Sequence, residues 1–237
     1  MSETVIYRRI PRPDKALIEC LHGIPVADLY DVMDDVDQKL RLMNSAMRPI
    51  VPETSFVGPA VTAYNAPGDN LMMHTALYFA ERGDVVVLAS GGVPRAALWG
   101  TVGTITSQRN GIAAAVVDGP VRDTAQVREL RFPLFATSVS AVRPSQAMPG
   151  MVNVPIMCAG VLVRPGDIIV GDSDGVIVIA PADVERLAAA ARARIEREVA
   201  MHAAITSGAS TSFQHISGDA KLKNLGAVIK DGPWSDN

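Results

Sequence analysis

Arg122 and Asp123 are the residues of this chain whose types and spacing point most directly to chemistry. They follow a predicted strand that stops at Asp118 and a Gly119-Pro120 turn, and they begin a predicted helix. Ligands of α/β proteins bind at the carboxyl ends of strands. There an arginine can bind a carboxylate through two hydrogen bonds, and an aspartate can hold Mg²⁺. In the alternative interpretation, Asp123 only caps the helix and pairs with Arg128, and the spacing alone favours neither.

The glycine-containing segment from Gly91 to Gly103 is a second candidate site. Glycines after a buried strand let the backbone come close to a ligand, and free N–H groups at the start of a helix attract anions. The segment lacks the lysine of a P-loop and does not match GxGxxG. Gly100 and Gly103 would equally permit tight helix packing.

A third candidate is the segment from Pro67 to His74. Asn70 and His74 are four residues apart and therefore share one face of a predicted helix. A single histidine is more often structural than functional, so this pair is the weakest of the three signals. An acidic cluster nearer the N-terminus predicts a solvated face, and its members are Asp31, Asp34, Asp35 and Asp37.

Alternating strands and helices must position these residues. We expect strands at 58–64, after the turn at 82–84, at 111–118 and at 133–137. We expect helices at 14–22, 26–33, 70–80, 96–109, 124–130 and 181–204. A hairpin turn at 172–175 joins two further strands. Strand–helix alternation predicts parallel pairing in the middle and the hairpin adds an antiparallel part, which together indicate a mixed α/β sandwich. Residues 206–237 form a polar tail that is loosely ordered or docked on a neighbouring subunit.

The composition excludes several classes of protein. Hydrophobic residues make up 48% of the 237 residues and charged residues 20%, which excludes a disordered chain. The net charge of −3 gives no basic excess for binding nucleic acid, and no apolar stretch is long enough for a membrane span. The first fifteen residues show no apolar core of a secretion signal. Cys20 and Cys158 form no CxxC motif, so we expect buried thiols in a cytoplasmic protein.

Taken together, the motifs resemble the RraA-like family, which contains the regulator of ribonuclease activity A and two class II pyruvate aldolases. These aldolases cleave 4-hydroxy-4-methyl-2-oxoglutarate and 4-carboxy-4-hydroxy-2-oxoadipate. The resemblance runs from about residue 10 to about residue 205 and fits the aldolase branch. It is carried by PGDNLMMH, RGDVVVLAS, GIAAAVVDGPVRD, VNVPIMCAGVLVRPGDIIVGDSDGVIVI and ARARIERE. It implies a single-domain αββα sandwich with a swivelling ββα core over residues 1–205, and homotrimers or hexamers with sites between subunits.

The resemblance also implies roles for individual residues. Asp123 would hold Mg²⁺ or Mn²⁺, helped by Glu198 of an adjacent subunit, with Glu196 as the second choice. Arg122 would bind the keto acid and steady its enolate oxygen, and the backbone N–H groups of Val102 and Gly103 would hold the pyruvyl carboxylate. The expected substrate-binding residues are Arg122, Val102, Gly103, Asn70, Gly100 and Thr101.

Thr101 departs from the aldolase pattern, which has an acidic residue at this position, 21 residues before the arginine. A threonine hydroxyl cannot accept a proton at neutral pH, and retro-aldol cleavage must deprotonate the 4-hydroxyl group. We therefore expect a metal-dependent lyase for pyruvyl-containing keto acids that decarboxylates oxaloacetate, with His74 as a substitute base for aldol cleavage. The alternatives are a non-catalytic regulatory binding protein and a lyase with an altered substrate.

Overall fold

The computed structural model describes residues 4–33, 39–91, 95–232 and 234. Three members of the acidic cluster, Asp34, Asp35 and Asp37, lie outside the described residues, as does the stretch 92–94 of the glycine-containing segment. The chain divides into two compact units, Met1–Ala191 and Arg192–Asn237. The division falls inside the long helix α7 (Val184–Thr206).

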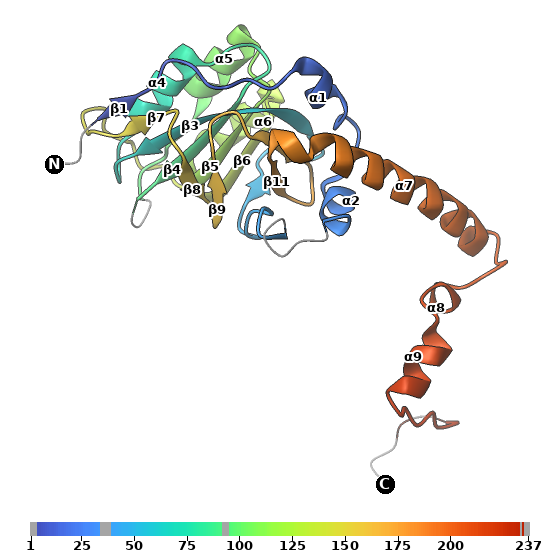
Figure 1. Cartoon of the computed structure of the whole chain (residues 1–237). Helices are drawn as coiled ribbons and strands as arrows, with labels where there is room; N and C mark the ends of the chain where they lie inside the picture. The colour runs from blue at the N-terminus through green and yellow to red at the C-terminus, as the bar shows by residue number, and fades with distance from the viewer. Residues whose placement is uncertain (1–3, 34–38, 92–94, 233, 235–237) are drawn as a thin grey trace. The chain divides into compact units, whose positions relative to one another are not determined.

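A mixed sheet forms the centre of the first unit (Figure 1). Its middle strands run parallel in the order β3-β4-β5-β6, and β7 and β10 pair with β3 in antiparallel fashion. The strands are β1 (Val5–Ile6), β2 (Arg48–Pro49), β3 (Phe56–Asn65), β4 (Val85–Ser90), β5 (Ala114–Val121), β6 (Leu134–Val139), β7 (Met151–Val152), β10 (Ile168–Gly171) and β11 (Val176–Ile179). The first half of β3 pairs with β10 and the second half with β4. The predicted parallel centre and antiparallel hairpin are therefore confirmed.

The central strands are hydrophobic on both faces, because successive side chains of a strand point to opposite sides. In β4, Val86 and Leu88 join one hydrophobic cluster, whereas Val85 and Val87 join another. On the first face lie helices α4 (Leu71–Phe79), α5 (Thr101–Asn110) and α6 (Thr124–Leu130) (Figure 1). The second face is covered by the hairpin of β8 (Ile156–Cys158) and β9 (Val161–Val163), and α2 (Val26–Asp31) packs against β11. This layer order is the predicted αββα sandwich.

Several predicted boundaries were wrong. The helix predicted over 96–109 begins only at Thr101, because Leu98 and Trp99 pair with the end of β5 instead of joining the helix. The strand predicted to stop at Asp118 continues to Val121 through a register shift between Val117 and Pro120. The helix predicted from Pro181 starts with a 3₁₀ turn, Pro181–Asp183, and helix α1 covers only Lys15–Glu19.

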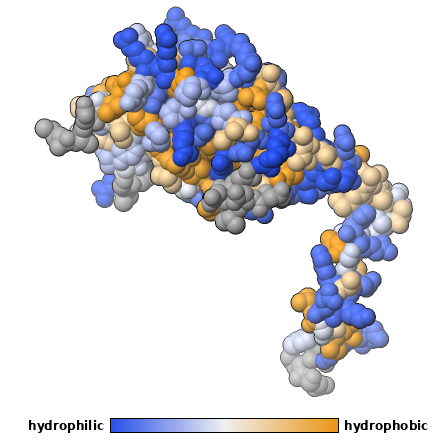
Figure 2. Space-filling model, viewed as in Figure 1, coloured by the Kyte–Doolittle hydropathy of each residue, from blue (hydrophilic) through white to orange (hydrophobic). Residues whose placement is uncertain are grey.

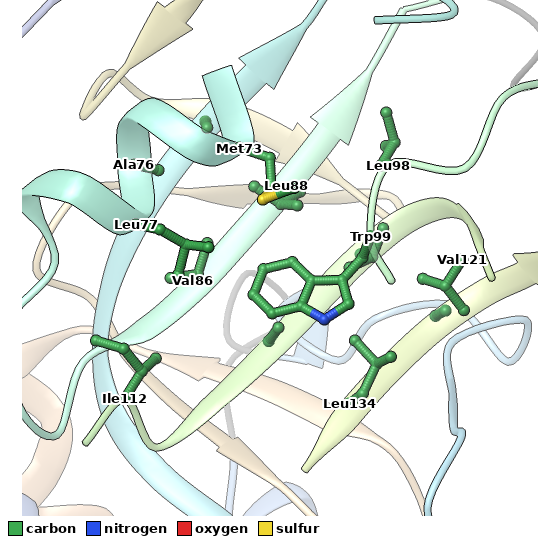
Figure 3. Packing of buried hydrophobic residues seen from close by; sticks show 14 of the residues in the cluster. Met73, Ala76, Leu77, Val86, Leu88, Leu98, Trp99, Ile112, Val121 and Leu134 are labelled. Carbon is green, nitrogen blue, oxygen red and sulfur yellow. The ribbon is translucent and has the colours of Figure 1, made fainter. Parts of the chain in front are cut away.

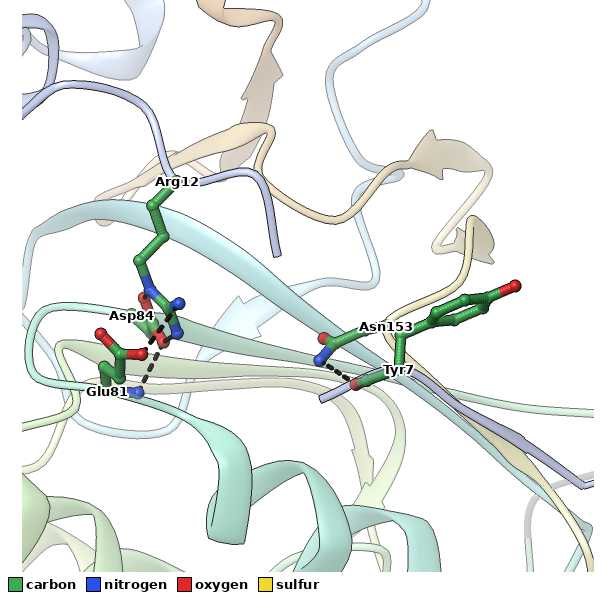
Figure 4. Close-up of polar contacts among 5 residues, drawn as sticks. All are labelled: Tyr7, Arg12, Glu81, Asp84 and Asn153. Atoms are coloured by element: carbon green, nitrogen blue, oxygen red, sulfur yellow. Dashed lines mark hydrogen bonds and ion pairs between the residues drawn. The ribbon is translucent and has the colours of Figure 1, made fainter. Parts of the chain in front are cut away.

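An ion-pair cluster holds the N-terminal segment on the first unit (Figure 4). Arg12 donates from Nε and Nη2 to the two carboxylate oxygens of Asp84 at 3.1 and 2.7 Å, and its Nη1 lies 3.0 Å from Oε1 of Glu81. The hydrogen bond to Asp84 raises the pKa of the Arg12 guanidinium. Nearer the start of this segment, the backbone carbonyl of Tyr7 accepts a hydrogen bond from the side-chain amide of Asn153 at 2.8 Å. This cluster fixes a segment that has little regular structure of its own.

The two cysteines are free thiols in different surroundings. Cys158 is buried as predicted, and its burial raises the pKa of its thiol well above the ordinary value. Cys20 is only half-buried, because it ends the short helix α1 on the surface. No helix within the described residues has the length and apolar character that a membrane span needs.

The second unit consists of the end of α7 and two short helices, α8 (Ser212–His215) and α9 (Gly218–Asn224). A capping box between Thr211 and Gln214 starts α8. Within the described residues of this unit, no hydrophobic side chain is buried, and apolar side chains lie open on its surface (Figure 2). The predicted docking of this tail on a neighbouring subunit stays a prediction.

Candidate active site

The site begins where an extended segment pairs with the end of β5. Leu98 donates its N–H to the carbonyl of Pro120 at 2.8 Å, and Arg122 donates its N–H to the carbonyl of Trp99 at 3.0 Å. Trp99 and Val121 form an isolated parallel bridge between these bonds. As a consequence, the start of α5 lies directly beside the Arg122-Asp123 pair, although twenty residues separate them in the sequence.

Trp99 anchors the start of α5 in the hydrophobic core (Figure 3). Its side chain is 1% exposed, and it stacks on Phe132 with ring centroids 6.0 Å apart. The indole Nε1–H donates to Oγ1 of Thr104 at 3.0 Å. A Cβ atom on Gly103 would come within 3.0 Å of the indole ring, so this glycine allows the helix to close over Trp99. The predicted packing role of Gly103 is thus seen in the structure.

Asp123 occupies the N-cap position of α6 but does not cap the helix. Its backbone is left-handed (φ 56°, ψ 34°), a conformation that non-glycine residues adopt rarely and that occurs often at functional sites. Its Oδ2 instead accepts the N–H of Thr101 at 3.1 Å and lies 3.6 Å from Nε of Arg122. The predicted alternative partner, Arg128, donates to the carbonyl of Ile50. The structure therefore contradicts the interpretation of Asp123 as the cap of α6 and the partner of Arg128, because its carboxylate accepts the first N–H group of α5 instead.

Gly100 makes this arrangement possible. A Cβ atom at this position would lie 2.7 Å from Oδ2 of Asp123 and 3.1 Å from Cγ of Arg122. Its backbone is extended (φ −166°), so the requirement for glycine is one of space and not of backbone conformation. The absence of a side chain lets the carboxylate reach the first N–H group of α5.

A cavity of about 330 Å³ opens beside this pair. It brings together eight residues singled out from the sequence, namely Asn70, His74, Gly100, Thr101, Val102, Gly103, Arg122 and Asp123. Three further lining residues, Met73, Ala97 and Trp99, lie within two of the candidate segments but were given no role of their own. Arg143, Pro144 and Gln146 also line the cavity and lie outside every candidate segment. Glu198 belongs to the second unit, where its Oε1 lies 2.7 Å from Nη2 of Arg194. The functional roles of all these residues stay predictions.

The cavity offers hydrogen-bond donors suited to an anion. The first N–H groups of a helix have no partner within the helix, and here Asp123 engages only that of Thr101. The N–H groups of Val102 and Gly103 have no partner within the helix, and they lie at its N-terminus, which carries partial positive charge. Asn70 is 7% exposed, and its Oδ1 has no hydrogen-bond partner among the described residues. This oxygen is a hydrogen-bond acceptor, so it suits a donor group of a ligand and not a carboxylate.

His74 lies on α4 and lines the same cavity as Arg122. Its Nε2 is 3.2 Å from Nε2 of Gln146. Burial lowers the pKa of its imidazole, which therefore stays neutral at pH 7 and can accept a proton.

The buried carboxylate of Asp69 organises the remaining wall. Oδ2 of Asp69 accepts hydrogen bonds from Oγ of Ser145 and N of Ala147, both at 2.6 Å, and from N of Met148 at 3.1 Å. Its Oδ1 accepts the N–H of Leu71 at 2.8 Å. Burial alone would raise the pKa of Asp69, but the hydrogen bonds from Ser145 and the backbone outweigh burial and lower it. Asp69 therefore ties loop 143–148 to the start of α4.

The cavity suits a divalent metal ion that takes few of its ligands from this chain. Among the described residues, no group of three or more His, Cys, Asp or Glu side chains could hold a metal ion. The lining set contains one carboxylate, that of Asp123, and its Oδ1 accepts no hydrogen bond from the described part of the chain. Mg²⁺ often binds through one or two carboxylates and takes its other ligands from water and substrate. The residues present fit such an ion and do not fit a cage made by this chain alone.

Comparisons with known proteins agree with the fold and with the sequence resemblance. A family model described as "RraA-like: Aldolase/RraA" matches residues 26–178. A relative from Halalkalibacterium halodurans, named provisionally as a 4-hydroxy-4-methyl-2-oxoglutarate aldolase, is 36% identical over 183 residues, which cover 77% of this chain and 85% of that protein. A relative from Cupriavidus necator with the same provisional name is 34% identical and covers 64% of this chain and 92% of that protein.

Solved structures give the same result. RraAS2 from Streptomyces coelicolor, described as an unusual member of the RNase ES inhibitor RraA protein family, superposes with a TM-score of 0.74 at 27% identity, covering 82% of this chain and 99% of that chain. An uncharacterised protein from Pseudomonas syringae gives a TM-score of 0.75 at 26% identity, covering 86% and 98% of the two chains. The family model spans more than half of the sequence and the solved folds agree, so this chain belongs to the RraA-like family.

Proposed function

We propose that this chain is a lyase that uses a divalent metal ion to break a carbon–carbon bond in pyruvyl-containing 2-keto acids. Its substrates would be oxaloacetate, which it would decarboxylate, and 4-hydroxy-2-oxo acids, which it would cleave as an aldolase. The observation that carries the proposal is the Asp123 carboxylate, which leaves its capping position and faces the cavity beside Arg122. The provisional aldolase names of the relatives support a lyase.

The chain's own groups account for binding of the pyruvyl unit. The N–H groups of Val102 and Gly103 would hold the carboxylate, as helix N-termini do for anions. Arg122 lines the same cavity and would place its guanidinium beside the C2 oxygen. Asp123, together with Glu198 of an adjacent subunit, would hold Mg²⁺ or Mn²⁺. When bound, such an ion polarises the keto-acid carbonyl as a Lewis acid.

Decarboxylation of oxaloacetate needs no base from the protein. The bond between C3 and C4 breaks, CO₂ leaves, and the electron pair forms the C2–C3 double bond while negative charge moves to the C2 oxygen. Arg122 stabilises that charge because it is a fixed cation at the position where the charge develops. A proton from solvent then adds to C3 and gives pyruvate.

Aldol cleavage requires one more step, which is removal of the proton from the 4-hydroxyl group. The side chain of Thr101 cannot accept this proton at neutral pH. His74 can, because burial keeps its imidazole neutral and it lines the same cavity. We therefore expect cleavage to depend on His74 and decarboxylation not to depend on it. A His74→Ala variant that cleaves 4-hydroxy-4-methyl-2-oxoglutarate at the wild-type rate would remove this role.

The proposal is tested by measuring pyruvate release from oxaloacetate and from 4-hydroxy-4-methyl-2-oxoglutarate, with Mg²⁺ and with a chelator. We expect release that the chelator abolishes and that Asp123→Ala lacks. If the wild-type chain turns over neither substrate, the alternative of a non-catalytic regulatory binding protein is favoured, in keeping with the inhibitor family to which RraAS2 belongs. Slow turnover of both test substrates with full metal dependence would favour a lyase whose pocket Thr101 has reshaped.

A further inference from the structure

We propose that Arg143 binds a second carboxylate at the far end of the substrate, so that the cavity selects keto acids with two negative charges over those with one. This inference rests on the proposed function, because it assigns the far half of the same cavity. Arg143 lies in a loop without regular periodicity. Together with Pro144 and Gln146, it forms the cavity wall contributed by loop 143–148.

The charges of the cavity are unbalanced in favour of an anion. The charged lining residues are Arg122, Asp123 and Arg143, which leave one positive charge in excess, and His74 is neutral at pH 7. Arg122 already has Asp123 beside it, whereas Arg143 makes no ion pair with any residue that the structure describes. The N–H groups of Val102 and Gly103 account for one carboxylate of a ligand. A second carboxylate would give Arg143 the partner that the chain does not supply.

The chemistry of arginine suits this task better than that of any other lining side chain. A guanidinium group presents planar, parallel N–H donors that match the two oxygens of a carboxylate. Asn70 and Gln146 can donate a hydrogen bond but bring no charge. Arg143 is the group of this wall that distinguishes a carboxylate from a methyl group at the same position.

The backbone holds Arg143 from both sides. Before it, the carbonyl of Val142 accepts the N–H of Ala97 at 2.9 Å. After it, Ser145 donates its N–H to Gly68 at 2.8 Å and accepts the N–H of Asn70 at 3.1 Å. Asp69 adds its three hydrogen bonds to the same loop. Less conformational entropy is lost on binding when a loop is fixed beforehand, so this placement favours recognition by Arg143.

Isothermal titration calorimetry on the full chain with Mg²⁺ present tests the inference, using 2-oxoglutarate as the dianionic probe and pyruvate as the monoanionic probe. We expect wild type to bind 2-oxoglutarate more tightly than pyruvate. Arg143→Gln should weaken 2-oxoglutarate binding roughly 10- to 100-fold, as for loss of a charged hydrogen-bond pair, and leave pyruvate binding unchanged. Arg143→Lys should show a smaller loss, because a lysine keeps the charge without the planar donors. The matched control is Arg109→Gln, which removes an exposed arginine of α5 outside the cavity.

The inference is overturned if Arg143→Gln binds both probes like wild type, if it loses affinity for both equally, or if wild type binds neither probe. These outcomes are separate from failure of the proposed lyase activity. If wild type releases no pyruvate but Arg143→Gln loses the selectivity for dianions, the role of Arg143 in binding stands and the proposed lyase activity is wrong. A chain that releases pyruvate but shows no role of Arg143 in selectivity would retain the lyase and lose this inference.

Discussion

Two arginine–aspartate pairs in this chain have the same chemistry in opposite settings. Arg12 and Asp84 share two hydrogen bonds, and the Asp84 side chain is 1% exposed (Figure 4). Arg122 and Asp123 approach only to 3.6 Å through one atom each, and their side chains are 37% and 36% exposed. The first pair satisfies its own members, whereas the second leaves donors and an oxygen for other groups. A pair whose groups satisfy each other therefore has a structural role, whereas a pair that leaves groups unsatisfied can bind a ligand.

Loss of Arg122 should have the largest effect, and the effect should be on catalysis. Arg122→Gln removes the cation beside the developing negative charge, so kcat/KM for oxaloacetate should fall about 10²- to 10³-fold. The melting temperature should hardly change, because an exposed ion pair contributes little to stability. Steady-state kinetics and thermal unfolding of the same preparation measure both. A large loss of stability with intact kinetics would reverse the roles assigned to the two pairs.

Loss of Asp84 should act in the opposite way. Asp84→Asn leaves Arg12 without its buried partner, and we expect unfolding free energy to fall by about 3 kcal/mol while kcat/KM stays at the wild-type value. Urea denaturation gives this number. Glu81→Gln is the matched control, because the Glu81 side chain is 65% exposed and its ion pair with Arg12 should contribute less than about 1 kcal/mol. Equal effects of the two variants would contradict the assignment of stability to the buried bond.

Asp69 adds to the comparison a carboxylate whose hydrogen-bond donors are all uncharged. Hydrogen bonds lower its pKa in the folded chain, so its contribution to stability is complete above the ordinary carboxyl pKa and is lost as the pH falls through the lowered value. Asp69→Asn should reduce unfolding free energy by about 1.5–3 kcal/mol at pH 7. The difference from wild type should shrink below about pH 4. Urea denaturation across this pH range checks the trend, and a difference that grows toward acid pH would show the sign to be wrong.

Gly100→Ala should give the smallest effect. The added Cβ would lie 2.7 Å from Oδ2 of Asp123 and must displace the carboxylate, although the extended backbone of Gly100 accepts alanine. Displacement of a site group costs rate more than stability, so we expect about a tenfold loss of kcat/KM and a nearly unchanged melting temperature. Gly175→Ala serves as the control, since its Cβ would meet only Cδ1 of Leu42 at an ordinary 3.7 Å. Unchanged kinetics in Gly100→Ala would mean that the position of the Asp123 carboxylate does not matter.

Much of the fold was predictable because local patterns determine it. Runs such as Val85–Leu88 are apolar at every position, as strands buried on both faces must be, and the Asp172–Gly175 turn indicates its hairpin directly. The Arg122-Asp123 pair was also visible, because it follows a strand and a turn. These features depend on neighbours within a few residues.

Other features depend on contacts between distant segments and could not be predicted. Residues 96–98 have helix-forming composition, but pairing of Trp99 with Val121 delays the helix until Thr101. Arg143 lies in a loop with no periodicity. Hydrogen bonds from this loop to Asp69, and backbone bonds to Gly68, Asn70 and Ala97, hold the loop at the cavity. The sequence shows Asp69 as a turn residue, because nothing local indicates a partner 76 residues away.

The most direct test of the role of the Arg122-Asp123 pair is a titration of the protein with Mn²⁺ in the presence of oxalate. The electron paramagnetic resonance signal of the free ion would be followed for wild type and for Asp123→Asn. If the Asp123 carboxylate holds the ion, wild type will bind Mn²⁺ at a saturable site and Asp123→Asn will not. Equal binding of Mn²⁺ by the two proteins would contradict the account, because the carboxylate beside Arg122 would then have no part in holding the ion.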